Sequence, residues 1–397
     1  MFYFFIINYE NSTKLFITVE RESAMKNKKF VSVVTMALTA TMGIGCLTGC
    51  EVGNRIASTG ENEVDKGYGD ESDNTVASDN SDETDKITIV WYPNESAEDY
   101  NAAREAYGKL IEQATGKKVD QKMTTDYTIA IEAIANGTAQ IAYMGAEGYV
   151  QAKNKSDAVT PLFVNSGASG TLDDALYYSF LAVKKDDKEQ YTSGEGYSLD
   201  HIKGKRMSFV SNSSTSGFKV PTNEIVKYFS KTKDGGKLTV DDLIEGGSDA
   251  FFSEVLFGGS HQGSAYNLLS GKADIAAFCN NEMVPYADCT GGTENEMGAV
   301  YTIRENASAP FDTLEGSEFV VIQSTPVLNG PFAYNADTLS AEDVTAIQTL
   351  FTSQEVADNE MIFVPEGSEQ AGLFEKDGKK CFLLVDDAWY DPIRTME

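Results

Sequence analysis

Metal-binding and redox residues are scarce in this sequence. It has two histidines among 397 residues, and its five cysteines form no CxxC pair. Zinc sites in proteins combine cysteine and histidine ligands at short, regular spacings, and no such spacing occurs here. We therefore expect no metal site and no cofactor.

The motifs of two common enzyme classes are also missing. The chain contains no G-x-S-x-G turn and no G-x-x-x-x-G-K-[S/T] loop. Ser216 and His261 offer a nucleophile and a base, but this one histidine would have to serve every acid–base step. A Ser/His hydrolase is therefore the least supported alternative, and we expect a protein that is not an enzyme.

Positive charge is in short supply. The chain has 32 Lys and Arg against 61 Asp and Glu, with a formal net charge of -29. A surface that follows nucleic-acid phosphates needs clustered Lys and Arg, and the body of the chain has no such cluster, so we expect no nucleic-acid partner. An acidic protein that binds an anion must overcome its own field, which makes local amides and hydroxyls more useful than long-range attraction.

Long apolar runs are missing as well, and the amino-terminal region has the order of an export signal. Met25–Lys29 is basic, Phe30–Gly45 is moderately apolar, and Leu47–Cys50 follows. The apolar run is short and rather polar for a membrane helix. Leu47-Thr-Gly-Cys50 resembles the lipobox of bacterial lipoproteins, which implies that Cys50 is lipid-modified and becomes the new amino terminus.

Three segments precede the expected folded body. Residues 1–24 read as an upstream extension, because the signal begins only at the following methionine. Residues 25–49 read as the signal peptide, and residues 50–86 as an acidic, flexible tether. Between Glu51 and Lys86 the chain has eleven acidic and three basic residues, with almost no large apolar side chains. Such a composition does not fold alone.

Strands alternate with helices from residue 87 onward. Ile87–Tyr92, Val119–Met123 and Gln140–Met144 have the apolar character of buried strands. The helix between the first two is closed by Gly116, and the next begins at a polar turn, Thr124–Tyr127. This alternation predicts a mainly parallel α/β sheet, whose ligands lie outside the carboxyl ends of its strands.

One internal sequence similarity, which we call the echo, indicates two lobes. Ile134–Ala142 and Leu268–Ala276 share a pattern of helix end, glycine and strand. A polar helix start precedes each copy, Thr124–Tyr127 in the first and Gly258–Ser264 in the second. The chain therefore reads as a clamshell of two similar α/β lobes.

We expect two crossings between the lobes to form a hinge. Residues 87–183 plus 331–397 would make up the first lobe, and residues 184–330 the second. Tyr177–Val183 is the strand that leaves the first lobe. The helix Ala341–Phe351 completes that lobe after the return.

A hydroxyl-rich turn, Ser211–Pro221, lies between an apolar run and a predicted helix. Ser214, Thr215 and Ser216 fall where the first amides of that helix lack internal partners. Those amides and the helix dipole favour an anion, which makes the turn a candidate site for a tetrahedral oxyanion held by neutral donors. The alternative is an ordinary helix cap.

Taken together, these segments resemble the phosphonate-, phosphite- and phosphate-binding proteins of bacterial ABC transporters, which are type II periplasmic binding proteins. The similarity spans residues 87–334, with agreement in order and spacing. The matching segments are Asp126-Tyr127, Gly137–Gly145, Ser214–Gly217 with Pro221, His261, Ala273–Ala276 and Asn329–Pro331.

This resemblance implies a set of site residues. In that family the Ser-Thr-Ser turn, the tyrosine and the histidine contact the oxyanion, which implies Tyr127, Ser214, Thr215, Ser216 and His261 here. The position of His261 at a second polar helix start favours the same role.

Two departures bear on the choice of ligand. Some members place a tyrosine after the strand that here ends at Tyr143-Met144, so the aromatic contact comes from Tyr143 or is absent. Members that bind an ammonium group use carboxylates, one of them near Asn329–Pro331, where this chain has none. Glu282 is a candidate for another. Phosphate, phosphite and a simple phosphonate therefore remain open.

The resulting hypothesis is a monomeric, lipid-anchored, extracytoplasmic binding protein that captures a small phosphorus oxyanion and delivers it to an ABC permease and ATPase. The alternative is a ligand-sensing lipoprotein that signals to a membrane partner, since the same pocket serves either role. Cys279 and Cys289 either form a disulfide or remain free thiols. Asp126 is expected to cap a helix.

Overall fold

The computed structural model describes residues 86–96, 100–194, 196–231, 238–365, 368 and 372–396. The expected upstream extension, the signal peptide, Cys50 and nearly all of the acidic tether lie outside these residues. Within the described residues, no helix has the length and apolar character needed to cross a membrane.

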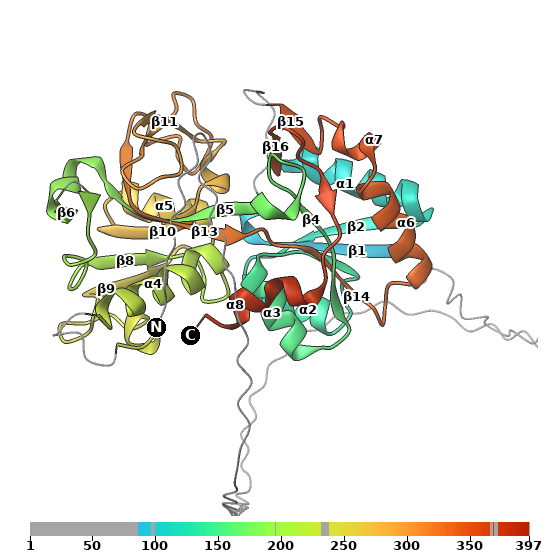
Figure 1. The fold of residues 1–397 in the computed structure, drawn as a ribbon, viewed down its shortest axis with the longest axis horizontal. Coiled ribbons are helices and arrows are strands. Elements are labelled where there is room, and N and C mark those ends of the chain that lie inside the picture. Colours follow the sequence, from blue (N-terminus) through green and yellow to red (C-terminus); the bar gives the residue numbers. More distant parts are fainter. Residues whose placement is uncertain are drawn as a thin grey trace, which may run out of the picture. The chain divides into compact units, whose positions relative to one another are not determined.

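The first lobe is built on a six-stranded sheet with the order β17-β4-β14-β3-β1-β2 (Figure 1). Its strands are β1 (Lys86–Trp91), β2 (Lys118–Met123), β3 (Ile141–Tyr143), β4 (Val159–Asn165), β14 (Phe332–Asn335) and β17 (Phe382–Leu383). Helices pack on both faces. One face carries α1 (Asn101–Thr115), α6 (Ala341–Phe351) and α7 (Gln354–Ala357), and the other carries α2 (Tyr127–Ala135), α3 (Ala146–Lys155) and α8 (Asp391–Arg394).

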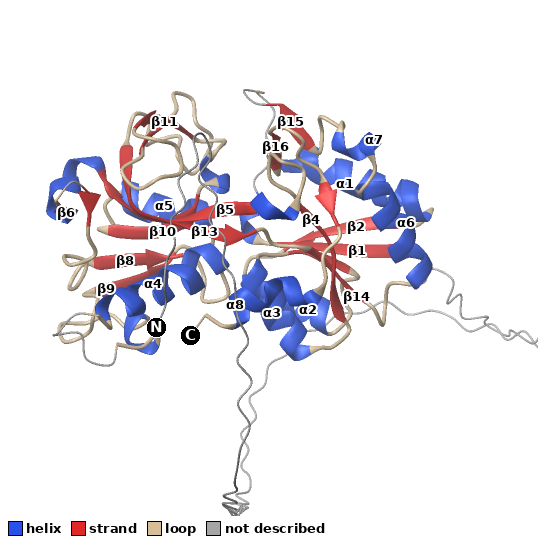
Figure 2. Ribbon diagram, viewed as in Figure 1, coloured by secondary structure: helices blue, strands red, loops and turns tan. Residues whose placement is uncertain are grey.

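The second lobe is built on a seven-stranded sheet with the order β11-β12-β13-β5-β10-β8-β9. Its strands are β5 (Leu176–Lys184), β8 (Arg206–Phe209), β9 (Glu254–Phe257), β10 (Ile275–Cys279), β11 (Ala287–Gly291), β12 (Val300–Ile303) and β13 (Glu318–Leu328). The helices α4 (Val220–Phe229) and α5 (His261–Leu269) cover opposite faces of this sheet (Figure 2). Two short strand pairs complete the fold: β6 (Thr192–Ser193) with β7 (Gly196–Tyr197), and β15 (Phe363–Pro365) with β16 (Phe374–Lys376).

Local signals placed several elements correctly. Gly116 ends α1 in the left-handed conformation, with φ of 71°. The predicted echo is confirmed: α2 leads through Gly137 into β3, and α5 leads through Gly271 into β10, with φ of 78° and 80° at the two glycines. Glycine adopts such angles without steric cost, so it stops each helix and lets the chain turn into the next strand. The α6 helix has the bounds that were predicted.

The expectation of mainly parallel sheets is wrong. β1 pairs in parallel with β2 and β3, but β14 runs antiparallel to β3 and β4. In the second sheet β5 runs antiparallel to both β10 and β13. The reason is topological. β5 and β14, the first strand after each crossing, run in the opposite direction to the helix–strand repeat strands β10 and β3 beside them.

Two adjacent crossings connect the lobes. β5 and β13 form a long antiparallel pair from Leu176 opposite Leu328 onward, and the Asn329 amide donates to the Ala175 carbonyl over 3.0 Å. The expected division placed residues 177–183 in the first lobe, but strand pairing puts β5 in the second sheet. The returning strand β14 pairs in the first sheet.

The return to the first lobe passes through a glycine with no room for a side chain. A Cβ atom at Gly330 would lie 2.0 Å from the Met144 carbonyl oxygen. We expect Gly330→Ala to lower the free energy of unfolding by about 1–3 kcal/mol, the usual cost of overpacking, measured by urea denaturation. Gly247→Ala is the matched control, because its Cβ would find its nearest atom at 4.0 Å. Equal stability of the two variants would contradict the packing described here.

Candidate functional site

A small cavity lies where the two lobes meet. Its volume is about 50 Å³, whereas one water molecule needs about 10–15 Å³. It therefore has room for a group of a few heavy atoms. Both lobes contribute to its wall, with Tyr127 and Gly145 from the first and Thr215 and His261 from the second.

Four helical segments begin beside this cavity, and each follows the carboxyl end of a strand. The pairs are β2 with α2, β3 with α3, β8 with the π-helical turn Thr215–Lys219 that leads into α4, and β9 with α5. The first amides of a helix have no internal partners, and the helix dipole adds partial positive charge there. Four such starts therefore direct the positive ends of their dipoles toward the cavity, and no basic side chain is involved.

The hydroxyl-rich turn supplies two side chains to the cavity wall. Ser214 Oγ accepts a hydrogen bond from the Gly217 amide at 3.0 Å, so this serine is also the helix cap that was the alternative interpretation. Thr215 Oγ1 accepts from the Glu147 amide at 2.9 Å, and thus caps α3 of the opposite lobe. In both residues the hydroxyl proton is left to donate elsewhere.

Ser216, the third predicted hydroxyl, is not brought to the cavity. Its Oγ is buried beside the Tyr177 phenol and makes no hydrogen bond of good geometry among the described residues. Its carbonyl oxygen accepts from Ser179 Oγ at 2.7 Å. The nucleophile–base pair considered for a hydrolase is not formed, because Ser216 Oγ has no hydrogen bond to His261.

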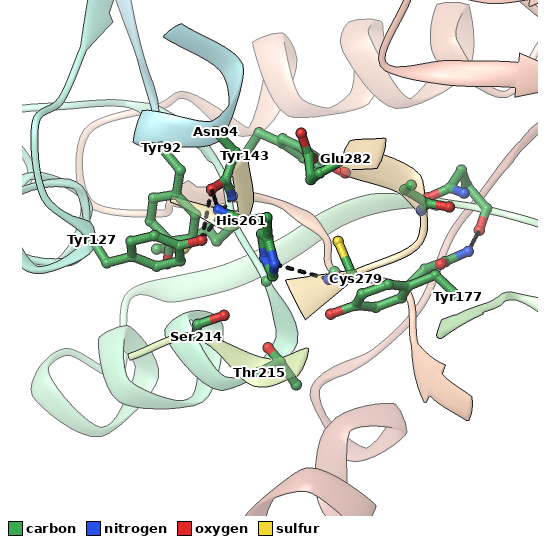
Figure 3. Close-up of a pocket in the computed structure, with 16 residues that line it drawn as sticks. Tyr92, Asn94, Tyr127, Tyr143, Tyr177, Ser214, Thr215, His261, Cys279 and Glu282 are labelled. Atoms are coloured by element: carbon green, nitrogen blue, oxygen red, sulfur yellow. Dashed lines mark hydrogen bonds between the residues drawn. The ribbon is translucent and has the colours of Figure 1, made fainter. Parts of the chain in front are cut away.

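His261 is held as a neutral imidazole with one defined tautomer. Its Nδ1 accepts a hydrogen bond from the Cys279 amide at 3.0 Å (Figure 3). Burial lowers the pKa of His261 to about 3. Since Nδ1 is an acceptor, the proton of the neutral ring must be on Nε2, where it can be donated to a ligand.

Tyr127 is joined to His261 through Asn94. The Tyr127 hydroxyl lies 2.7 Å from Asn94 Nδ2 and 3.0 Å from Asn94 Oδ1, and the His261 amide donates to Asn94 Oδ1 at 3.2 Å. Tyr143 also borders the cavity, while its ring packs on Phe332 with centroids 4.7 Å apart. It therefore serves the core as well as the cavity wall.

Glu282 is the one residue of the described cavity wall with a charge-bearing side chain, apart from the histidine; no Lys or Arg lines the cavity. Burial raises the pKa of Glu282 to about 7, against the opposing effect of hydrogen bonds from Gln262 and Tyr100. Gln262 Nε2 donates to Glu282 Oε2 at 2.9 Å. A half-buried carboxyl group with this pKa is partly protonated at neutral pH.

Some wall residues were missed by the sequence reasoning. Tyr92 and Asn94 follow β1 directly, so the rule that ligands lie beyond strand carboxyl ends could have found them. Tyr177 lies on β5, where no local signal marks it. Burial raises the pKa of Tyr177, and the Cys279 and Glu282 side chains raise it further.

Neither a metal cluster nor a disulfide occurs in the described part of the chain. No group of three His, Cys, Asp or Glu side chains is placed to hold a metal ion there. Cys279, Cys289 and Cys381 form no disulfide, which resolves the open question of a Cys279–Cys289 bridge in favour of thiols. Asp126 accepts from the Thr128 amide and caps α2, as predicted.

Comparison with known proteins gives consistent matches. The family model of the periplasmic substrate-binding protein of phosphonate ABC transporters matches residues 89–390. The phosphate-import protein PhnD of Mycolicibacterium smegmatis is 26% identical over 317 residues, which cover 78% of this chain and 84% of that protein.

Two solved structures share the fold. A binding protein component of an ABC phosphonate transporter from Pseudomonas aeruginosa aligns with a TM-score of 0.54 and 20% identity, over 78% of this chain and 85% of that chain. PhnD1 from Prochlorococcus marinus, in complex with methylphosphonate, aligns with a TM-score of 0.56 and 14% identity, over 79% and 97%.

The tautomer of His261 can be observed directly. His201 is the second histidine of the chain, and His201→Asn removes its signal. In this variant, labelled with ¹⁵N-histidine, we expect His261 to be a neutral Nε2–H imidazole that does not titrate between pH 5 and 8, because its pKa is lowered to about 3. The same sample unfolded in urea should titrate near 6.5, the ordinary histidine value. A native-state signal that titrates in this range, or an Nδ1–H tautomer, would contradict the geometry.

Proposed function

Because this chain belongs to the family of periplasmic substrate-binding proteins of phosphonate ABC transporters, we propose that it captures a small phosphorus oxyanion between its lobes for uptake. The ligand class is phosphate, phosphite or a simple phosphonate. The observation that carries the proposal is the small cavity onto which four helix starts converge. The related mycobacterial protein is named for phosphate import, which supports the same class.

The oxyanion would be held by neutral donors. The hydroxyls of Ser214 and Thr215 and the Nε2–H of His261 would donate to a tetrahedral group in the cavity, and the Tyr127 hydroxyl, which donates to Asn94 Oδ1, lies in the same wall. Preorganised dipoles in a site of low dielectric interact strongly with an anion, because little water competes with them. The helix starts add to this field. Uncharged donors suffice even in a protein with a net charge of -29.

Ligand binding and lobe closure would support each other. Besides the Thr215–Glu147 contact, Ser213 Oγ donates across the lobes to Gln151 Oε1 at 2.8 Å, and His261 contacts Asn94. A ligand that touches both lobes binds this closed arrangement more tightly than an open one. It therefore shifts the population toward closure by that difference in affinity.

The partners would be a membrane permease and an ATPase, which receive the ligand from the closed protein. The protein would remain outside the cytoplasm as a monomer held by a lipid on Cys50. An acidic segment of this composition between the lipid and the body would let the body stand off from the membrane.

The lipid anchor is tested by one substitution. Cys50→Ala should move the protein from the membrane fraction to the aqueous phase of cells expressing it, because the acceptor of the lipid is gone. The matched control is Cys381→Ala, which removes a thiol in the described body. If the Cys50 variant still sediments with membranes, the anchor lies elsewhere.

The ligand class and the site are tested together. A thermal-shift panel of phosphate, phosphite, methylphosphonate, 2-aminoethylphosphonate and sulfate should show stabilisation by at least one phosphorus oxyanion, since a ligand of the native state raises the melting temperature. Thr215→Val should then weaken that binding about tenfold to a hundredfold, the effect of losing a hydrogen bond to a charged group at about 1.5–3 kcal/mol.

Thr215→Ser is the control, because it keeps the hydroxyl. Calorimetry that finds the wild-type affinity in Thr215→Val would remove this residue from the site. No stabilisation by any phosphorus compound would refute the ligand class.

A further inference from the structure

Glu282 is the residue of the cavity wall that is least expected in a site for an anion. It follows β10 in the turn Asn281–Met283 and borders the same cavity as Ser214, Thr215 and His261. An ionised carboxylate there would repel any oxyanion held by those donors, and the cavity has no Lys or Arg to offset the repulsion. Either the ligand brings a cation to Glu282, or a proton lies between the carboxyl group and the oxyanion.

Apart from Glu282, the wall offers a cation only neutral side chains, such as those of Asn165, Asn281 and Asn329. An ammonium group has three donors and needs several acceptors or a second negative charge when it is desolvated. The return segment contributes Asn329 and Gly330 to the cavity, and no second carboxylate borders it. The neighbouring His261 Nε2–H is a donor, which also opposes a positive group.

Burial and hydrogen bonding act in opposite directions on the carboxyl group of Glu282. Gln262 from α5 bonds one of its carboxyl oxygens, and Gln262 Nε2 is shared with the Asn94 carbonyl at 3.3 Å. Tyr100 contacts the same carboxyl from the first lobe. Burial outweighs these two hydrogen bonds, so the pKa of the group is raised to about 7. A carboxylic acid kept neutral by an apolar site can serve as a hydrogen-bond donor.

We propose that Glu282 binds the ligand as a neutral carboxylic acid, with its O–H donated to an oxygen of the phosphorus oxyanion. The site then takes phosphorus oxyanions that carry no cationic substituent. This inference rests on the proposed function. It specifies which subclass of ligand the site takes and states that binding requires a proton on Glu282. No bond to phosphorus changes. The carboxyl group that is ionised at alkaline pH takes one proton from solvent when the ligand binds, in addition to any proton that the ligand already carries.

The need for a proton on Glu282 sets the direction in which affinity changes with pH. Below about pH 7 the carboxyl is protonated before the ligand arrives, and binding is at full strength. Above that pH each binding event must take up a proton, so affinity falls toward tenfold per pH unit. The other titratable groups that face this part of the cavity are the His261 imidazole, the Cys279 thiol and the phenols of Tyr100 and Tyr177. His261 stays neutral over this range, and phenols ordinarily titrate near pH 10.

The experiment is isothermal titration calorimetry with phosphate and with methylphosphonate at pH 6.0 and 8.5, in buffers of different ionisation enthalpy. At pH 8.5 we expect the wild type to take up nearly one proton more per bound ligand than the Glu282→Gln variant takes up. The glutamine side chain also donates a hydrogen bond, and it does not lose this proton as the pH rises. The variant should therefore bind the ligand at least tenfold more tightly than the wild type at pH 8.5. At pH 6.0 the two should agree within a few-fold.

Two controls isolate the carboxyl group. Glu254→Gln changes an exposed carboxyl on β9 and should keep the wild-type pH profile. Cys279→Ser should keep it as well, although a free thiol ordinarily titrates near pH 8.5. If the pH dependence disappears in Cys279→Ser instead of Glu282→Gln, the proton belongs to the thiol and the inference is overturned. The proton uptake of the wild type is informative even if a variant fails to fold.

The expectation that the site does not favour a cationic substituent on the ligand is tested with 2-aminoethylphosphonate. We expect the wild type at pH 6.0 to bind it more weakly than methylphosphonate. A tenfold preference for the amine, lost in Glu282→Gln, would show an ionised carboxylate and overturn the inference. Binding of phosphate or methylphosphonate with identical pH profiles in wild type and Glu282→Gln would also overturn it, while leaving the proposed function intact. Failure of every probe to bind would refute the proposed function itself.

Discussion

The structure depends on one electrostatic constraint: a site for an anion has to be made in a strongly acidic protein without a basic side chain in its wall. Backbone amides at helix starts meet this constraint, because their partial charges are fixed by the fold and bring no mobile side chain. To converge, the helices must begin at the facing edges of two sheets. The clamshell architecture, with strand carboxyl ends turned toward the gap, provides that arrangement.

The lobes are packed as separate bodies. Two hydrophobic clusters lie within the second lobe and one within the first, and the fourth is also built from the first lobe apart from Val210 and the partly buried Leu328. Contacts across the gap are mainly polar, such as Ser213 with Gln151 and Gln262 with Asn94. Water can replace these bonds when the lobes part. Movement therefore costs little apolar burial, and the ligand can tip the balance.

Local patterns were sufficient for many of the elements, and six of the sixteen residues that line the cavity had been named as site residues from the sequence. Periodicity, glycine stops and polar helix starts are short-range signals, which is why Gly116, Gly137 and the α6 bounds could be read from sequence. Pairing of β5 and the position of Tyr177 depend on strands far away in the chain, and no local feature records them. Ser216 does not reach the cavity, and the reason is geometric. Successive residues of a helical turn point in different directions, about 100° apart in an α-helix. Three consecutive hydroxyls therefore cannot all face one cavity.

The capping of α3 by Thr215 limits how the site can vary. A hydroxyl has two lone pairs and one proton, and here the Glu147 amide uses a lone pair while the proton remains for the cavity. A Cβ atom at Gly145 would lie 2.9 Å from the same hydroxyl oxygen. Positions 145 and 215, in different lobes, therefore restrict each other, and neither can enlarge alone. A change of ligand preference at this contact therefore requires coordinated substitutions in the two lobes.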